Sequence, residues 1–208
     1  MTSRGRLIAF EGGEGSGKST QAARLAEELG ALLTREPGGT PVGDRIRSLL
    51  LEGDPDHIGP EAELLLVAAA RAEHVREVVA PALEAGLDVV TDRFSGSSLA
   101  YQGYGRGIDP AVVASVSLLA TKGLVPDLNI LLDVPGRVAR GRMARSPDRI
   151  ERAGREFHRR VSEGFRRIAA GDPEHWVVVN GDGSRDEVAE RVRSAVRAAL
   201  LPAERAGE

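Results

Sequence analysis

Apolar and polar positions along the chain follow two different spacings, which together predict a succession of strands and helices. Five short apolar runs predict buried strands, at 7–10, 31–35, 87–91, 128–133 and 176–180. Between them, apolar residues recur at helical spacing, as they do at Ala22, Leu25, Ala26 and Leu29. This spacing predicts helices at 21–29, 42–51, 61–85, 109–121, 135–143, 156–170 and 184–200.

The alternation of strands and helices indicates parallel βαβ units with right-handed crossovers, hence an α/β fold with helices on both faces of a five-stranded parallel sheet. We expect Pro81 to end or kink its helix, and 94–107 to form a short helix and a loop. Asp109 and Ser184 are expected N-caps. Ligands of such sheets bind beyond the carboxyl ends of the strands. These ends carry Glu11, Arg35, Asp92, Arg93 and Asp133.

A glycine-rich loop separates the first predicted strand from the first predicted helix. It consists of Gly12, Gly13, Glu14, Gly15, Ser16, Gly17, Lys18, Ser19 and Thr20. Residues 12–19 fit G-x-x-x-x-G-K-[ST], in which backbone N–H groups surround phosphates, the lysine reaches the β- and γ-phosphates and the hydroxyl binds Mg²⁺. Lys18 and Lys122 are the only lysines in the chain, so a lysine at this position by chance is improbable. The loop therefore predicts binding of ATP with Mg²⁺.

Composition and charge narrow the class of protein. The 208 residues suffice for one α/β domain, and we expect a single domain over 1–208. A net charge of −3 predicts no general attraction to nucleic acid or membrane, and no uncharged stretch is long enough to span a bilayer. The chain has no cysteine, which excludes disulfides and thiolate chemistry. Without a signal-peptide pattern at the start, we expect a cytoplasmic protein.

Arginines outside the glycine loop predict a second anion site. Arg71 and Arg93 come from two separate segments, and Arg142, Arg145 and Arg149 form a basic cluster around Pro147. A phosphate acceptor is largely ionised near neutral pH and needs no general base, but its repulsion from ATP must be offset by arginines and Mg²⁺. We interpret 142–153 as a lid that brings arginines to the transferring phosphoryl group and excludes water. The alternative is a solvated charged face of a helix pair.

Further motifs resemble those of the thymidylate kinase family, and the resemblance covers nearly the whole chain. They lie at 10–14, 34–40, 92–94, 100–107, 126–134, 148–151 and 157–165. The resemblance implies a P-loop NTPase fold, a three-layer αβα sandwich with a small lid. It also implies transfer of the γ-phosphoryl group of ATP to dTMP, which gives dTDP for dTTP synthesis, and a homodimer packed through helices.

The resemblance also implies roles for individual residues. Glu14 would contact the 3′-hydroxyl of dTMP or Mg²⁺-bound water, and Arg93, assisted by Arg35, would bind the dTMP phosphate. Asp92 would act near Mg²⁺ through water. Lys18 and the arginines of the lid would stabilise the transferring group. Residues near the base and the sugar would be Pro37, Val67, Arg71 (at the thymine edge), Ser98, Tyr101 (under the deoxyribose) and Gln102.

Plainer interpretations stand beside these roles. Arg71 could be a surface arginine, Tyr101 ordinary packing, and Asp92 with Arg93 a structural ion pair. Val67 stands where the family often has an aromatic residue, so aliphatic contact would replace stacking on thymine. Ser98 stands where some members have Asn.

Two other functions compete with this one. A kinase of another monophosphate, such as dUMP or CMP, would share most of these features, and a P-loop regulatory switch would need only one anion site. A GTPase is disfavoured, because the nearest match to [NT]KxD, at 121–124, ends in Leu124.

Overall fold

Five parallel strands form the centre of this computed structural model, which describes residues 4–54, 57–142 and 148–200. Their order across the sheet is β2-β3-β1-β4-β5, and every neighbouring pair is parallel. The predicted α/β fold with a five-stranded parallel sheet is therefore confirmed. The strands are β1 (Leu7–Glu11), β2 (Leu32–Arg35), β3 (Val89–Asp92), β4 (Leu128–Asp133) and β5 (Trp176–Asn180).

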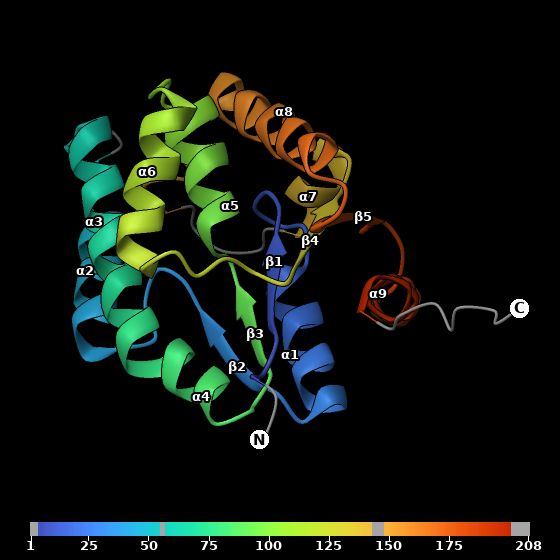
Figure 1. The fold of residues 1–208 in the computed structure, drawn as a ribbon. Coiled ribbons are helices and arrows are strands. Elements are labelled where there is room, and N and C mark those ends of the chain that lie inside the picture. Colours follow the sequence, from blue (N-terminus) through green and yellow to red (C-terminus); the bar gives the residue numbers. More distant parts are fainter. Residues whose placement is uncertain (1–3, 55–56, 143–147, 201–208) are drawn as a thin grey trace, which may run out of the picture.

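Helices cover both faces of this sheet and complete three layers (Figure 1). One face carries α1 (Lys18–Leu29) and α9 (Arg185–Leu200). The other carries α3 (Pro60–His74), η1 (Val75–Val79), α4 (Ala80–Glu84), α5 (Ser95–Ser98), η2 (Leu99–Gly105) and α8 (Arg155–Gly171). The helices α2 (Pro41–Leu51) and α6 (Pro110–Thr121) pack against α3, and α7 (Gly136–Arg142) follows β4.

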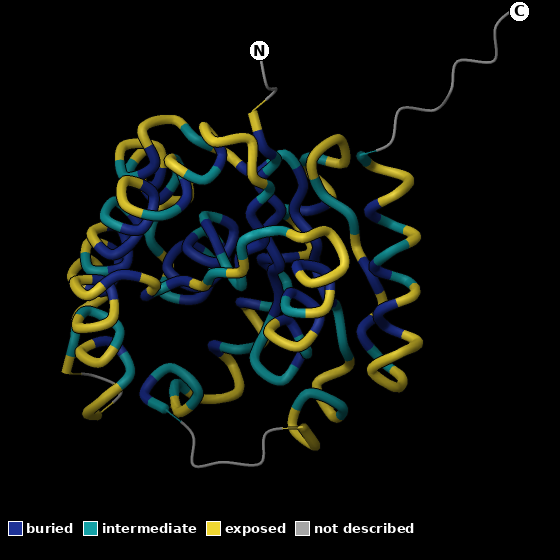
Figure 2. Tube along the Cα trace, turned by 90° about the horizontal axis from the view of Figure 1, so that it is seen from below, coloured by how far each residue is buried: buried dark blue, intermediate teal, exposed yellow. Residues whose placement is uncertain are grey.

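Alternate residues of β1 enter two different parts of the core. Ile8 and Phe10 pack with α1 and α9, whereas Leu7 and Ala9 pack with η1 and α4 on the opposite face. All four side chains are fully buried, and Figure 2 shows the buried positions gathered along the strands and the inner sides of the helices. Burial on both faces explains why the strand sequences are continuous apolar runs.

Two helical segments differ from the predictions. The helix expected at 61–85 is interrupted by the π-helical turn η1 just before Pro81, and this wider turn accommodates a residue that has no N–H and whose ring crowds the preceding turn. The loop expected within 94–107 is instead helical, as α5 and η2. Its glycines serve close packing: a Cβ on Gly96 would lie 2.5 Å from Trp176, and one on Gly105 would lie 2.7 Å from Phe157.

Both predicted N-caps are confirmed. The Asp109 side chain accepts a hydrogen bond from the backbone N–H of Ala111 at 2.9 Å. Ser184 Oγ accepts one from the N–H of Glu187 at 3.2 Å, and the Glu187 carboxylate accepts one from the Ser184 N–H in return. Among the described residues, no helix combines the length and the apolar character needed to cross a bilayer.

Candidate active site

The carboxyl ends of the neighbouring strands β2, β3 and β1 bring predicted site residues together. The glycine loop follows β1, which lies between β3 and β4, so the chain changes direction across the sheet at this point. Arg35 is paired with Asp92 in the register of β2 and β3, and Phe10 is paired with Asp92 in that of β1 and β3. Such a switch point is where parallel sheets open a crevice for ligands.

Glycine is required at two positions of the loop. Gly15 has φ of 70°, and a Cβ there would lie 2.3 Å from the Ala139 carbonyl oxygen. Gly12 has φ of 140°, and its Cβ would lie 2.7 Å from the Leu132 oxygen. Only glycine tolerates both the backbone conformation and the contact. The loop is thereby held against β4 and α7.

Lys18 lies at the start of α1 with its ammonium group turned into the loop. Its Nζ donates to the Gly13 carbonyl oxygen at 2.7 Å and to Ser16 Oγ at 3.3 Å. Burial and, after it, the positive charge of Arg93 lower the pKa of Lys18 to about 8, while the charge of Glu14 acts in the opposite direction. A phosphate in the loop would stabilise the charged form.

Ser19 and Asp92 form a pair that fits Mg²⁺. Ser19 Oγ donates to Asp92 Oδ2, and Asp92 Oδ1 is buried with no hydrogen-bond partner among the described residues. Mg²⁺ is commonly held by one or two protein oxygens, retained waters and substrate phosphates. One hydroxyl and one carboxylate beside a phosphate loop match that set, although the described residues contain no cluster of three metal-ligating side chains.

Arg93 lies at the centre of the site, directly after β3. Its backbone has φ of 76°, a strained conformation for a residue other than glycine. The guanidinium donates to the Gly12 oxygen and to Ser97 Oγ, both at 3.1 Å, and it forms an ion pair with Glu14. It also lies over the ring of Tyr101, 5.0 Å from the centroid.

Glu14 joins the glycine loop to this arginine. The Tyr101 hydroxyl donates to Glu14 Oε1 at 3.1 Å. Burial favours the neutral acid, but the charges of Arg93 and Lys18 together outweigh it and lower the pKa of Glu14 to about 2. The group is therefore a carboxylate at neutral pH, placed between two cations.

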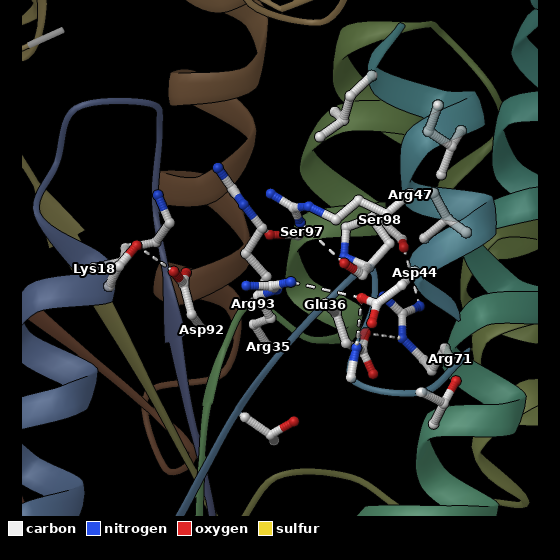
Figure 3. A pocket seen from close by; sticks show the side chains of 18 of the residues that line it. Lys18, Arg35, Glu36, Asp44, Arg47, Arg71, Asp92, Arg93, Ser97 and Ser98 are labelled. Atoms are coloured by element: carbon white, nitrogen blue, oxygen red, sulfur yellow. Dashed lines mark hydrogen bonds and ion pairs between the residues drawn. The ribbon is translucent and has the colours of Figure 1, made fainter. Parts of the chain in front are cut away.

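A cavity of about 920 Å³ opens beside Arg93 (Figure 3). In Figure 3, Lys18 and Asp92 lie on one side of it, Arg71 and Glu36 lie on the other, and Arg93 lies between them. The structure brings to its wall every residue predicted to bind the second substrate: Glu14, Arg35, Pro37, Val67, Arg71, Arg93, Ser98, Tyr101 and Gln102. Arg71 is only 2% exposed, so it is no surface arginine.

A second cavity, of about 790 Å³, lies on the other side of the glycine loop. Its wall includes 14–21 of the loop and α1, together with Arg142, Gly181, Gly183 and Val188. Of the loop residues predicted to bind ATP, Gly12 and Gly13 do not line it. The two cavities share Glu14, Lys18 and Ser19 and therefore meet at the lysine.

The two described arginines predicted for the lid, Arg142 and Arg149, do not converge on that junction. Arg142 donates to the carbonyl oxygens of Gly181 at 2.9 Å and Gly183 at 3.1 Å, so it braces the second cavity. Arg149 lines neither cavity, because it is fully buried in an ion pair with Glu63 and donates to the Leu50 oxygen at 2.6 Å. The role predicted for Arg149 is thus not seen. Arg145 lies outside the described residues.

Sequence reasoning missed several residues that build the site. Arg47 and Glu36 line the first cavity. Glu11, expected only at the sheet edge, accepts hydrogen bonds from the N–H groups of Phe94 and Ser97, both at 3.0 Å, and so holds the start of α5. Burial raises the pKa of Glu11 to about 7, against these hydrogen bonds. The available signals were the positions of Glu36 inside the motif at 34–40 and of Glu11 inside the motif at 10–14.

Comparison with known proteins agrees with this geometry. A family model described as thymidylate kinase matches residues 10–192. The thymidylate kinase of Synechococcus sp. (strain JA-2-3B'a(2-13)) is 52% identical over 199 residues, which are 93% of this chain and 95% of that one. The thymidylate kinase of Bradyrhizobium diazoefficiens is 45% identical over 209 residues, covering 96% and 92%.

A solved structure is also similar over most of its length. The thymidylate kinase from Ehrlichia chaffeensis superimposes with a TM-score of 0.78 at 32% identity, covering 93% of this chain and 99% of that one. Because the match covers 93% of this chain, it is not confined to the P-loop. The chain belongs to the thymidylate kinase family.

Proposed function

We propose that this protein transfers the γ-phosphoryl group of ATP to dTMP, giving ADP and dTDP. The observation that carries the proposal is the pair of cavities that meet at Lys18, one beside the glycine loop and one beside Arg93. A phosphoryl group passing between two substrates needs both to lie in line across such a junction. Membership of the family supplies the identity of the two nucleotides.

At the junction, side chains of the protein would offset the negative charge of the two substrates, and the transfer itself needs no general base. Lys18 would move from the Gly13 carbonyl to the β- and γ-phosphates of ATP. Arg93 would bind the dTMP phosphate, which is largely ionised near neutral pH and can attack without losing a proton. Ser19, together with Asp92 through water, would hold Mg²⁺, which supplies charge neutralisation between the phosphates.

Farther along the first cavity, Arg71 and Ser98 would face the base, with Gln102 beside them, and Tyr101 would pack under the deoxyribose. Tyr101 is held edge-on by Phe157 and Phe165, at ring-centroid distances of 6.1 Å and 6.0 Å. A ring fixed in this way leaves little room for an added 2′-hydroxyl, which supports preference for a deoxynucleotide.

The test is a coupled assay of ADP release with ATP, Mg²⁺ and each nucleoside monophosphate in turn. We expect turnover with dTMP to lie far above the background of ATP hydrolysis. Faster turnover with dUMP or CMP would favour the competing kinase. Hydrolysis that is indifferent to every monophosphate would favour a regulatory switch, against which the first cavity, beside Arg93, already argues.

Three further features belong to the same proposal. The described chain folds around one sheet, which supports a single kinase domain. The lid stays a proposal over about 142–153, of which 143–147 lie outside the described residues. Exposed leucines on α3 and α6, Leu65 at 61% and Leu119 at 81%, support a homodimer, which sedimentation at several concentrations would detect. A cytoplasmic location is consistent with the absence of cysteine.

A further inference from the structure

A buried polar chain leads away from the first cavity behind Arg71. Arg71 Nε donates to Glu36 Oε2 at 2.7 Å, and Glu36 Oε1 is bonded to His74 Nδ1 at 2.9 Å. His74 Nε2 is bonded in turn to Thr34 Oγ1 at 2.6 Å. Arg71, Glu36 and His74 are each no more than 3% exposed. This series of hydrogen bonds joins β2, the loop after it and α3. No step of the reaction described above uses Glu36, His74 or Thr34.

The donors of Arg71 are almost fully committed to the protein. Nε serves Glu36, and Nη1 contacts Ser98 Oγ at 3.0 Å and Ser117 Oγ at 3.4 Å. Nη2 donates to the Phe94 carbonyl oxygen at 3.0 Å. A guanidinium has five N–H groups and no acceptor. Among the described residues, one N–H, on Nη2, therefore has no partner and is left for a ligand in the cavity that Arg71 lines.

The roles of donor and acceptor at His74 follow from its partners. A carboxylate only accepts, so Nδ1 carries a proton and donates to Glu36 Oε1. That bond fixes the second oxygen of the same carboxylate on Arg71 Nε. The ring has no freedom to turn, because it is fully buried and a Cβ on Gly39 would lie 2.9 Å from its Cδ2. Thr34 holds the far side of the ring.

We propose that Glu36 and His74 are positioning residues for base selection: they hold Arg71 so that its one remaining N–H can meet only a hydrogen-bond acceptor. A guanidinium accepts from nothing, so a carbonyl at the base edge is bound and an amino group there is rejected. The distinction is that between thymine and cytosine at position 4. This inference rests on the proposed function, because it requires dTMP in the first cavity.

The test compares two substitutions of one residue. In His74→Asn, the carboxamide nitrogen can take the position of Nδ1 and still donate to Glu36. In His74→Gln, the carboxamide reaches instead toward Thr34 and leaves Glu36 Oε1 without its donor. Both remove the ring, so a merely structural role would affect them alike. The readout is kcat and KM for dTMP and for dCMP, with KM for ATP as the control.

For His74→Gln we expect KM for dTMP to rise about tenfold or more, because a hydrogen-bonded charged group loses its fixed geometry. We expect kcat, KM for ATP and the low activity on dCMP to change by less than about twofold, and His74→Asn to keep most of the wild-type preference. Equal preference for dTMP over dCMP in all three proteins would overturn the inference. A wild type without that preference would instead overturn the proposed function.

A second pair of variants serves if either histidine variant does not fold. Thr34→Val removes the hydroxyl bonded to His74 Nε2 at nearly constant volume, and Thr34→Ser keeps it. We expect Thr34→Val to lower the preference for dTMP over dCMP severalfold relative to Thr34→Ser, through KM for dTMP. If the two variants have the same preference for dTMP over dCMP, the inference is overturned, because the hydrogen bonds from Thr34 through His74 would then not determine the position of Arg71.

Discussion

At the scale of single residues, Arg93 combines a strained backbone with a central place in the site. Its φ of 76° directs the guanidinium back over the glycine loop, to the Gly12 oxygen and to Glu14. The N–H of Arg93 donates to the Phe10 oxygen at 2.9 Å, which ties the strained residue to β1. The hydrogen bond to the neighbouring strand thereby holds Arg93 in its strained conformation, as is common for residues at functional sites.

Replacing Arg93 by alanine tests whether this guanidinium binds the acceptor phosphate. We expect kcat/KM for dTMP to fall about 100-fold or more, because a charged hydrogen-bonding group in a desolvated site is lost. KM for ATP should change much less, since the glycine loop remains. Steady-state kinetics measures both, with circular dichroism as a check on folding. Unchanged kinetics with dTMP would remove Arg93 from the site.

Lys18 predicts a pH dependence of ATP binding. Burial lowers its pKa to about 8 in the free enzyme, below the ordinary value of 10.5, and bound phosphate would raise it again. Binding then takes up a proton, so affinity should fall as pH rises through 8, by up to about tenfold per unit. Calorimetry in buffers of different ionisation enthalpy measures the proton uptake. Lys18→Arg should bind more weakly but without uptake near pH 8; equal uptake in both proteins would contradict this origin.

Val67 tests the base end of the first cavity. Its side chain is 9% exposed and lines the wall where an aromatic residue often stands in the family. If stacking on thymine is missing, Val67→Phe should supply it and tighten dTMP binding by about 0.5–1.5 kcal/mol. Equilibrium titration with dTMP, compared with Val67→Leu, gives the answer. Weaker binding in the Phe variant alone would show that the cavity is already filled.

The residues predicted to bind substrate were found from the motifs and from the family resemblance, whereas the hydrogen-bonded network behind them was not. Arg71 was named in advance, but Glu36 and His74 belong to a buried network that joins separate elements and has no spacing of its own. Arg149 was misplaced for a related reason: a basic run predicts exposure unless a buried carboxylate such as Glu63 accepts one of its members. Sequence pattern alone does not reveal such a partner.

At the scale of elements, one face of α3 builds the wall of the first cavity and its support. Glu63, Val67, Arg71 and His74 recur at intervals of four, four and three, and all are buried. The apolar pattern predicted this helix, but it left open that Arg71 could be a surface arginine. The π-helical turns η1 and η2 were not predictable in this way, because periodicity does not distinguish them from α-helix or, in the glycine-rich 94–107, from a loop.

Glu63 links α3 to Arg149, within the range 142–153 that we interpret as the lid, and to η2. It pairs with Arg149 and Arg106 and accepts from Gln102 Nε2 at 2.9 Å, with no exposure of its own. Burial would raise the pKa of Glu63, but the hydrogen bonds from Arg106, Gln102 and Arg149 outweigh burial and lower it. A single carboxylate therefore offsets part of the positive charge of two arginines, Arg106 and Arg149, that lie beside α3.

Removing the charge of Glu63 should destabilise the fold. We expect Glu63→Gln to lower the free energy of unfolding by about 3–5 kcal/mol, because it removes a fully buried carboxylate charge that pairs with Arg149 and Arg106. Glu61→Gln, at an exposed position in the first turn of the same helix, should change this free energy by less than about 0.5 kcal/mol. Urea denaturation measures both. Similar small effects would show that water, rather than Glu63, compensates these arginines.

At the scale of the whole molecule, the order of strands places two anion sites side by side. The loop after β1 surrounds one, and the turn after β3 supplies the arginine of the other; β1 and β3 are neighbours in the sheet. This arrangement followed from the alternating pattern and the rule for parallel sheets. With the two sites side by side, we expect the phosphoryl group to pass directly from ATP to dTMP, with no phosphorylated residue in between.

The stereochemistry of transfer tests that expectation most directly. ATP made chiral at the γ-phosphorus with oxygen isotopes would be the donor, and the configuration at the transferred phosphorus of dTDP would be determined by NMR. A single in-line displacement across the shared wall at Lys18 predicts inversion. Retention would mean two displacements through a phosphorylated enzyme, and it would contradict the account of two substrates meeting at one junction.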